Sequence, residues 1–245
     1  MNRFELVGGM GATIVSTPIL APVPISTSAQ PTENDQCIEM WGIGWKGYKA
    51  VLRLRGRDVL PRMIYLDGDL WLMSPSFFHE LLAERLGSFA IDVFVGLGIP
   101  YIPAGHTTFR RLAKRGGVEA DKCYYLANEA RVRGKEKIDL RVDPPPDLVI
   151  EAVHTHKATA AIEVWRRFGV PEVWACDRDS LRILVLQGNG EYAETEVSSV
   201  IPRLKASEIL DWARRPRETS ELEWSREVRQ WVQDVLARRV NEQVG

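Results

Sequence analysis

The chain has 245 residues, of which 45% are hydrophobic and 27% charged, and its 32 basic and 33 acidic side chains give a formal net charge of -1. This length can bury one large core, or one core with a small appendage. The near-zero charge excludes a protein that coats nucleic acid nonspecifically, because such proteins are strongly basic, and leaves nucleic-acid contact to a local patch.

Membrane insertion and disulfide bonding are both disfavoured. No apolar run reaches the roughly 18 residues of a membrane span, and the N-terminus lacks the pattern of a signal peptide. The three cysteines, Cys37, Cys123 and Cys176, are too widely spaced for a disulfide framework or a metal knuckle. We expect a cytoplasmic protein with buried or incidental thiols and no membrane contact.

Residues 1–36 are rich in Pro, Ser, Thr, Gly and Ala and show no periodicity. This composition predicts a flexible leader or a loosely docked arm. We expect residues 37–245 to form a single domain. Near its start, two apolar runs flank Asp67-Gly68, the residue pair that favours a tight β-hairpin.

A helix is predicted after this hairpin. Ser76 is a plausible N-cap, and an apolar stripe follows it at helical spacing. Two glycines, Gly96 and Gly98, end the pattern. The stripe is formed by Phe78, Leu82, Phe89 and Val93.

Three strands, a second helix and a fourth strand are predicted next. The third strand, "DLVIEAV", is almost continuously aliphatic, as expected for a central strand covered on both faces. The order of helix, three strands, helix and strand indicates a mixed α/β domain. The expected ranges are 106–112, 121–129 and 147–153 for the strands, 157–168 for the helix and 171–177 for the last strand.

The C-terminal third is predicted to contain a hairpin and an amphipathic helix. The hairpin, 181–197, turns about Gly188-Asn189-Gly190. The helix, 220–240, has an apolar stripe that could dock on the domain or on a second subunit. Trp224, Val228, Trp231 and Val235 form this stripe.

Three carboxylates at strand ends could carry chemistry. Asp147 and Glu151 are four residues apart on one strand, about 13 Å along it, and cannot both hold one ion without a bend. Asp121 and Glu151 are a better pair, because neighbouring strands lie about 5 Å apart. Such oxygen ligands suit Mg²⁺, which can activate water for phosphodiester hydrolysis. A strand-end Asp can equally be a turn cap.

The histidines allow several interpretations. His154 and His156 could ligate a transition metal or act as a base, but no third nitrogen or sulfur ligand is in register, and lining of the site mouth is an alternative. His79, which precedes Glu80, could have a packing or capping role or a chemical one, and His106 is expected to be a strand-edge residue.

Two basic clusters could contact nucleic acid. They are "RRLAKR" at 110–115 and "RVRGKEK" at 131–137, which lie near the expected acidic edge. A local phosphate-binding groove is physically reasonable there. Each cluster could also be an ordinary solvated surface.

A family resemblance rests on several segments in the same order. They are "DGDLWLMSPSFFHE", the run from "GGVEADKCYYLANE" to "PPPDLVIEAVHTHK", "VWRRFGVPEVWACD" and "EYAETEVSSVIPRLKASEIL". Together they resemble the Uma family of restriction-endonuclease-like proteins (DUF820 type), in the PD-(D/E)xK nuclease superfamily. The resemblance covers about residues 55–235.

The resemblance implies a restriction-endonuclease-like core with a mixed central sheet: a helix, a sheet of the three strands 106–112, 121–129 and 147–153, a second helix and another strand. An N-terminal hairpin and a C-terminal helix are added to this core. It implies a site made of Glu80 from the first helix, Asp121 from the second strand and Glu151 from the third. Asp121 and Glu151 would hold Mg²⁺ or Mn²⁺, with Asp147 as an additional ligand. The implied substrate is DNA. We also consider a homodimer, because such a site cuts one strand at a time and the C-terminal helix could supply an interface.

The expected lysine is absent. The superfamily pattern places it two residues after the strand glutamate, where this chain has Val153. Relatives in the family carry it on the following helix, at the position of Ala161. Lys157 lies one helical turn before Ala161 and is the substitute we consider.

The leading hypothesis is a metal-dependent endonuclease in which Lys157 replaces the missing lysine. The alternative is a catalytically degenerate nuclease fold that serves as a nucleic-acid or protein interaction module. A third, weaker hypothesis is a metal hydrolase that uses His154 and His156.

Overall fold

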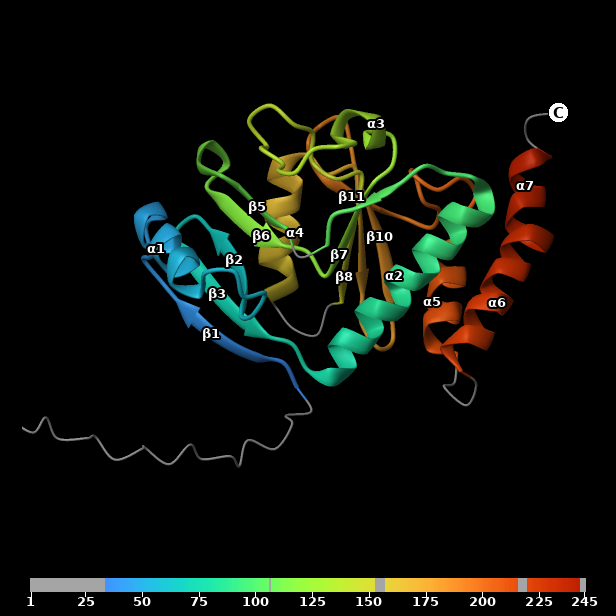
Figure 1. The fold of residues 1–245 in the computed structure, drawn as a ribbon, viewed down its shortest axis with the longest axis horizontal. Coiled ribbons are helices and arrows are strands. Elements are labelled where there is room, and N and C mark those ends of the chain that lie inside the picture. The colour runs from blue at the N-terminus through green and yellow to red at the C-terminus, as the bar shows by residue number, and fades with distance from the viewer. Residues whose placement is uncertain (1–33, 106, 153–156, 216–219, 243–245) are drawn as a thin grey trace, which may run out of the picture. The chain divides into compact units, whose positions relative to one another are not determined.

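Two β-sheets, with helices on their outer faces and one helix between them, make up the described part of the chain (Figure 1). The computed structural model describes residues 34–105, 107–152, 157–215 and 220–242. These belong to one compact unit, 31–245. The expected leader, apart from its last three residues, lies outside the described residues, as do His106, Val153, His154 and His156.

The first sheet has five antiparallel strands in the order β1-β3-β2-β6-β5. The predicted hairpin is confirmed as β2–β3, with Leu66 paired to Asp69. Asp67 and Gly68 both have positive φ, 54° and 115°, as the tight turn requires. The strands are β1 (Gln36–Met40), β2 (Arg62–Leu66), β3 (Asp69–Ser74), β5 (Thr108–Arg111) and β6 (Gly116–Glu119).

The second sheet has six strands in the order β11-β10-β9-β8-β7-β4. Only β8 and β9 pair in parallel, and a parallel pair needs a crossover, which α4 (Lys157–Phe168) supplies. The strands are β4 (Ile102–Pro103), β7 (Lys122–Tyr125), β8 (Leu148–Ala152), β9 (Glu172–Cys176), β10 (Leu181–Leu186) and β11 (Tyr192–Thr195).

The remaining helices complete the layers seen in Figure 1. They are α1 (Trp45–Arg55), α2 (Phe77–Leu97), the 3-10 helix η1 (Leu112–Lys114), α3 (Glu129–Val132), α5 (Ala206–Arg214), α6 (Glu221–Trp231), the π-helix η2 (Val232–Leu236) and α7 (Ala237–Asn241). None of these described helices combines the length and hydropathy needed to cross a bilayer. The expectation of a mixed α/β fold is confirmed.

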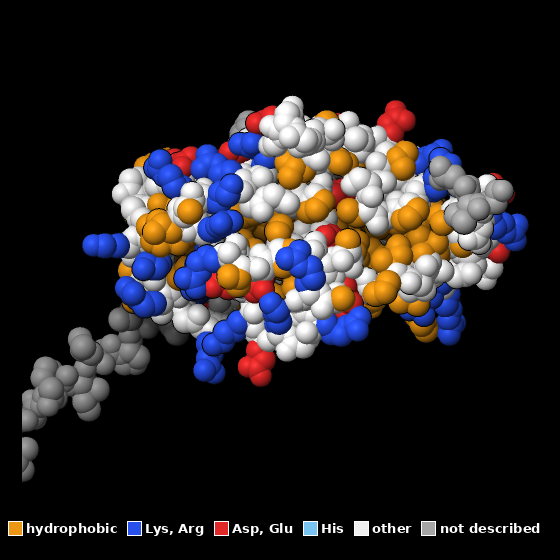
Figure 2. Space-filling view, turned by 90° about the horizontal axis from the view of Figure 1, so that it is seen from above, with side chains coloured by type: hydrophobic (Ala, Val, Ile, Leu, Met, Phe, Trp, Pro, Cys, Tyr) orange, Lys and Arg blue, Asp and Glu red, His pale blue; other side chains and the backbone are white. Residues whose placement is uncertain are grey.

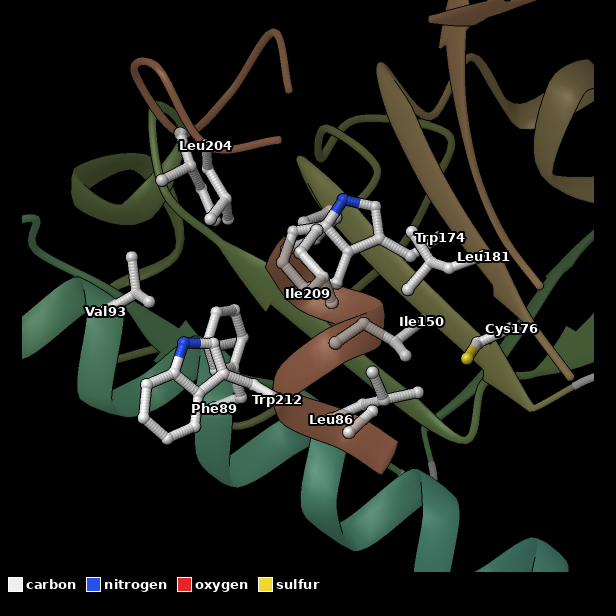
Figure 3. Packing of buried hydrophobic residues seen from close by; sticks show 14 of the residues in the cluster. Leu86, Phe89, Val93, Ile150, Trp174, Cys176, Leu181, Leu204, Ile209 and Trp212 are labelled. Atoms are coloured by element: carbon white, nitrogen blue, oxygen red, sulfur yellow. The ribbon is translucent and has the colours of Figure 1, made fainter. Parts of the chain in front are cut away.

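Helix α4 lies between the two sheets. Its Val164, Trp165 and Phe168 pack with Val118 from the first sheet and Val149 from the second. Helix α1 covers the outer face of the first sheet. On the outer face of the second sheet, α2 and α5 pack over Ile150 and Trp174 (Figure 3). Helix α6 packs in turn on α2.

The ends of α2 follow from its capping residues. The Oγ atom of Ser76 accepts a hydrogen bond from the backbone N–H of His79, as expected for an N-cap. Gly98 ends the helix with φ 68° in the left-handed region. The helix therefore runs through Gly96, which was expected to help end it.

One predicted strand belongs to a different sheet than expected. Residues 106–112 were expected to join 121–129 and 147–153 in one three-stranded sheet, but β5 pairs with β6 in the first sheet. The chain leaves that sheet after Glu119, crosses at Ala120-Asp121 and enters the second sheet at Lys122. Local periodicity could not reveal the crossover, because the residues before it (β6) and after it (β7) both have ordinary strand character.

The C-terminal helix docks on its own domain. Trp224 and Val228 are buried as predicted, but the stripe continues through Val232 and Leu236. Trp231 and Val235 are only half-buried. The π-helical turn η2 has more residues per turn than an α-helix, so Val232 and Leu236, four residues apart, both lie on the buried face.

Candidate nuclease site

The register of the second sheet places Asp121 beside Glu151. Strands β7 and β8 are antiparallel, with Lys122 paired to Ile150. Asp121 precedes Lys122 and Glu151 follows Ile150, so the same antiparallel register places Asp121 opposite Glu151. Cross-strand partners project to the same face of a sheet, so both carboxyl groups face α4, at the point where the chain crosses between sheets.

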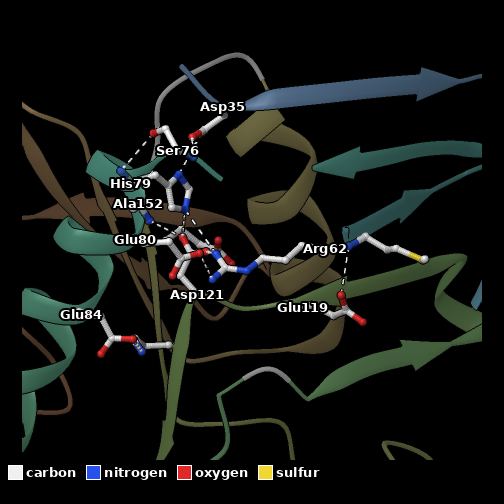
Figure 4. A network of polar contacts seen from close by, with 12 residues as sticks. Asp35, Arg62, Ser76, His79, Glu80, Glu84, Glu119, Asp121 and Ala152 are labelled. Carbon is white, nitrogen blue, oxygen red and sulfur yellow. Dashed lines mark hydrogen bonds and ion pairs between the residues drawn. The ribbon is translucent and has the colours of Figure 1, made fainter. Parts of the chain in front are cut away.

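Asp121 is buried and accepts bonds from three different groups (Figure 4). Its Oδ1 receives the guanidinium of Arg62. Its Oδ2 receives the backbone N–H of Ala152 at 2.7 Å and lies 3.1 Å from Nε2 of His79. The carboxylate is thus held by the first sheet, the second sheet and α2 together.

Arg62 links Asp121 to Glu80. It is the first residue of β2, only 4% exposed, and its side chain reaches from the first sheet toward α2. Nη2 donates to Oε1 of Glu80 at 2.7 Å, while Nη1 donates to Asp121. Glu80 is the outermost member of the group, with 38% of its side chain exposed.

His79 lies between two carboxylates. Its Nδ1 is 3.0 Å from Oδ2 of Asp35 and its Nε2 is 3.1 Å from Oδ2 of Asp121. Burial opposes protonation, but the hydrogen bonds to Asp121 and Asp35 outweigh it and raise the pKa of His79 to about 10. Both ring nitrogens therefore donate at neutral pH. At Asp35 burial raises the pKa, but the contact with His79 outweighs it and holds the pKa well below its usual range.

Glu151 has a different environment. Its Oε1 accepts a 2.6 Å hydrogen bond from Nε1 of Trp165, which α4 supplies. Burial, together with the charge of Asp121, raises the pKa of Glu151 to about 8. At Asp121 burial acts in the same direction, but the contact with His79 and the charge of Arg62 hold the pKa below its usual value. Asp121 is therefore ionised at neutral pH, and Glu151 is mostly protonated.

Asp147 does not join this group. It precedes β8 at the end opposite Glu151 and accepts from the backbone N–H groups of Leu126 and Asn128 at 2.8 and 2.9 Å. The side-chain amide of Asn128 donates to its other oxygen at 2.6 Å. These bonds fix the turn after β7, which is the capping role open to a strand-end aspartate.

The basic clusters of the sequence meet in a groove of about 960 Å³. Its walls are β5 with η1, the loop that carries Lys137 and Arg141, and α1 with Lys49 and Trp45. Arg110 and Arg111 come from the first cluster, and Lys137 ends the second. We call this the basic groove; its cations are Lys49, Arg110, Arg111, Lys137 and Arg141.

Comparison with known proteins assigns the family. Residues 49–217 match Uma2, described as "Putative restriction endonuclease". The chain belongs to the Uma2 family. A crystal structure of "a putative nuclease belonging to DUF820" from Anabaena variabilis is similar to it, with 17% identity, a TM-score of 0.47, and coverage of 62% of this chain and 92% of that one. None of the curated proteins compared with the chain matches it.

This Uma2 chain has a buried alanine at the helical position expected for lysine. Ala161 is 2% exposed and packs among apolar side chains of α4 and the sheets. Lys157 begins α4 one turn earlier; its side chain, like all of Val153, lies outside the described residues. Lys122 follows Asp121 directly, but it pairs with Glu84 on the other face of the sheet, so it does not replace the lysine.

The residues present, as arranged, do not fit a bound divalent ion. Within the described ranges, no three His, Cys, Asp or Glu side chains are grouped so as to hold a metal. Asp121 already accepts from Arg62, His79 and Ala152, and Glu80 accepts from Arg62.

Sequence reasoning missed Arg62 and Asp35, and it left His79 as a packing or capping residue. One signal was available: Arg62 stands directly before the apolar run "MIYL", and an arginine that enters a buried strand needs an acidic partner. The identity of that partner was not available, because Asp121 is 59 residues away.

Proposed function

We propose that this chain binds DNA through the basic groove, beside a nuclease site that no longer performs metal-dependent hydrolysis. The observation that carries the proposal is the groove itself. Five cations line it, and its one acidic residue, Asp139, is paired with Arg141. Figure 2 shows Lys and Arg side chains gathered over the half of the molecule that carries α1 and the first sheet.

The groove has the chemistry that nucleic acid requires. Lysine and arginine neutralise phosphates, which supplies most of the sequence-independent affinity for DNA. Trp45 is half-buried on Tyr48 and Tyr65, with ring centroids 5.2 and 5.5 Å apart, so its ring is held in place at the groove wall. A fixed aromatic ring next to phosphate-binding cations suits a strand whose bases can stack on it.

The groove also leads to the nuclease site. Thr108 lines both the basic groove and a smaller hollow of about 200 Å³, whose other walls include Arg55 and Arg62. Arg62 is in turn bonded to Asp121 and Glu80. DNA in the groove would therefore lie beside the cluster of Glu80, Asp121 and Arg62.

Hydrolysis that depends on Mg²⁺ or Mn²⁺ is the second candidate function. One observation favours it: Glu80, Asp121 and Glu151, the three acidic positions implied by the family resemblance, come together in one cluster. Against it stand Ala161 at the lysine position and the protein donors already bound to the carboxylates.

DNA binding is tested by fluorescence anisotropy with labelled single-stranded and duplex 20-mers over a range of salt concentrations. We expect wild type to bind, and the double variant Arg110→Ala/Lys137→Ala to bind more weakly, with a log–log salt slope smaller by about 2 because each lost phosphate contact removes about 1. The proposal is wrong if wild type binds neither probe at low salt.

A matched control separates the groove from general charge. Arg182→Ala/Arg226→Ala removes two exposed arginines from β10 and α6, so the net charge changes by the same amount. We expect its salt slope to equal that of wild type.

A plasmid-nicking assay with Mg²⁺ or Mn²⁺ tests the second candidate function, metal-dependent hydrolysis. This function requires cleavage by wild type, and loss of cleavage in Asp121→Asn with DNA binding retained.

A further inference from the structure

The guanidinium of Arg62 lies where a divalent ion would have to bind. One of its ends bonds Oδ1 of Asp121 and the other bonds Oε1 of Glu80 at 2.7 Å. The side chain is only 5% exposed and is delivered from a different sheet than Asp121 (Figure 4). A planar guanidinium can bridge two carboxylates with separate N–H groups, which a metal ion would do through the same oxygens.

Asp121 has little capacity left for another cation. Besides Arg62, it accepts from the backbone N–H of Ala152 at 2.7 Å and lies 3.1 Å from Nε2 of His79. Mg²⁺ demands oxygen ligands at about 2.0–2.1 Å in near-octahedral geometry. Such an ion would have to use the acceptor site that is left on Oδ1, directly beside the Arg62 guanidinium, or break one of these three contacts.

Electrostatics oppose simultaneous binding of Arg62 and a metal ion. An arginine stays charged at all relevant pH values. A divalent ion on Asp121 would be within a few ångströms of that fixed positive charge, in a buried setting where repulsion is weakly screened. The ion and the guanidinium therefore compete for the same two carboxylates.

We infer that Arg62 is a built-in cation that replaces the divalent metal in this site. It holds Glu80 and Asp121 together, it ties the first sheet to the second, and it keeps Mg²⁺ and Mn²⁺ out. This exclusion of metal rests on the proposed loss of metal-dependent hydrolysis and not on DNA binding by the basic groove, so DNA binding and Mn²⁺ exclusion can fail separately.

The test is Mn²⁺ binding, measured by isothermal titration calorimetry and by the electron paramagnetic resonance signal of free Mn²⁺. Wild type is expected to bind no Mn²⁺ at this site at millimolar concentration. Arg62→Met removes the internal cation and leaves its two carboxylate partners, so we expect at least about a tenfold gain in Mn²⁺ affinity. Adding Asp121→Asn to Arg62→Met should abolish the gain.

Two controls make the result specific to Arg62. Arg62→Lys retains a positive charge at this position and is expected to bind no more Mn²⁺ than wild type. Arg55→Met removes an arginine with 10% side-chain exposure whose ion pair is with one carboxylate, Glu119, so it leaves no pair of carboxylates freed by the change and no metal site should appear. Thermal unfolding of each variant shows that it is folded before titration.

The wild-type titration decides the matter even if Arg62→Met does not fold. Mn²⁺ binding by wild type that is lost in Asp121→Asn would overturn the inference, because the ion would then share the site with Arg62. Absence of binding by wild type supports it, and Arg62→Gln, which keeps a hydrogen-bond donor without the charge, provides a second neutral variant. A folded neutral variant that gains no Mn²⁺ affinity would also overturn it.

Discussion

Two neighbouring carboxyl groups, Asp121 and Glu151, have opposite protonation states because their partners differ. Asp121 receives Arg62, His79 and a backbone N–H, each of which favours the charged form. Glu151 is buried next to that negative charge and receives a neutral indole N–H from Trp165. The two carboxyl groups that the sequence paired as metal ligands therefore differ in charge at neutral pH.

Glu151→Gln is expected to change the pH dependence of stability. The pKa of Glu151 is about 8 in the folded chain against an ordinary value of 4.5. Below pH 4.5 both states hold the proton; between 4.5 and 8 the unfolded chain releases it and the folded chain does not, so wild type loses stability as pH rises. The glutamine variant lacks this loss, so its free energy of unfolding relative to that of wild type should rise with pH, by on the order of a few kcal/mol at pH 8.

Urea denaturation at pH 5, 6.5 and 8 measures this difference. The control is Glu194→Gln, which changes an exposed residue of β11. The difference in unfolding free energy between this variant and wild type should vary little over the three pH values. If the difference between Glu151→Gln and wild type is the same at all three pH values, the raised pKa of Glu151 is wrong.

At the scale of elements, the docking of the C-terminal helices on α2 depends on close approach at Gly96. A Cβ atom at this position would lie 2.5 Å from Cγ1 of Val232, which is fully buried. Neither α2 nor Val232 can move easily, because α2 packs on the second sheet and Val232 is part of the same buried core cluster. The glycine is required by its neighbour and not by a helix end.

Gly96→Ala is therefore expected to lower the free energy of unfolding by about 1–3 kcal/mol, the usual cost of overpacking a core. The matched control is Gly188→Ala in the β10–β11 turn, where an added Cβ meets nothing within 4 Å and the change should be within about 0.5 kcal/mol. Equal midpoints for the two variants in chemical denaturation would show that the contact with Val232 does not limit packing.

At the scale of the whole molecule, α6, η2 and α7 close one side of the core. Trp224, Val228, Val232 and Leu236 are all at most 2% exposed and cover the outer face of α2. The apolar stripe that suggested a contact with a second subunit is therefore covered within the chain. A homodimer, if one forms, needs another surface.

Deletion of residues 220–245 should prevent stable folding. Each of the four buried side chains contributes roughly 1.5–3 kcal/mol, a sum comparable with the 5–15 kcal/mol by which domains are typically stable. We expect the shortened chain to bind a hydrophobic dye and to lose its cooperative thermal transition. A shortened chain that melts sharply at the wild-type temperature would contradict this role of the helices.

The sequence by itself determined most of the elements and the family. The Asp67-Gly68 turn, the Ser76 cap and the apolar periodicities are local signals, because the atoms that they place are a few residues apart. The pairing of Asp121 with Glu151 also followed from strand ends on neighbouring strands. Helix caps, tight turns and apolar periodicity depend on residues only a few positions apart, so the sequence predicts them without knowledge of tertiary contacts.

Only the tertiary structure decided the state of the site. Arg62 reaches Asp121 across 59 residues, and His79 reaches Asp35 across 44. The crossover at Ala120-Asp121 brings the two sheets together and so delivers Arg62 to the carboxylates. Charge compensation between buried groups depends on distance in space, so the sequence could name the acids of the site but not the cation that they hold.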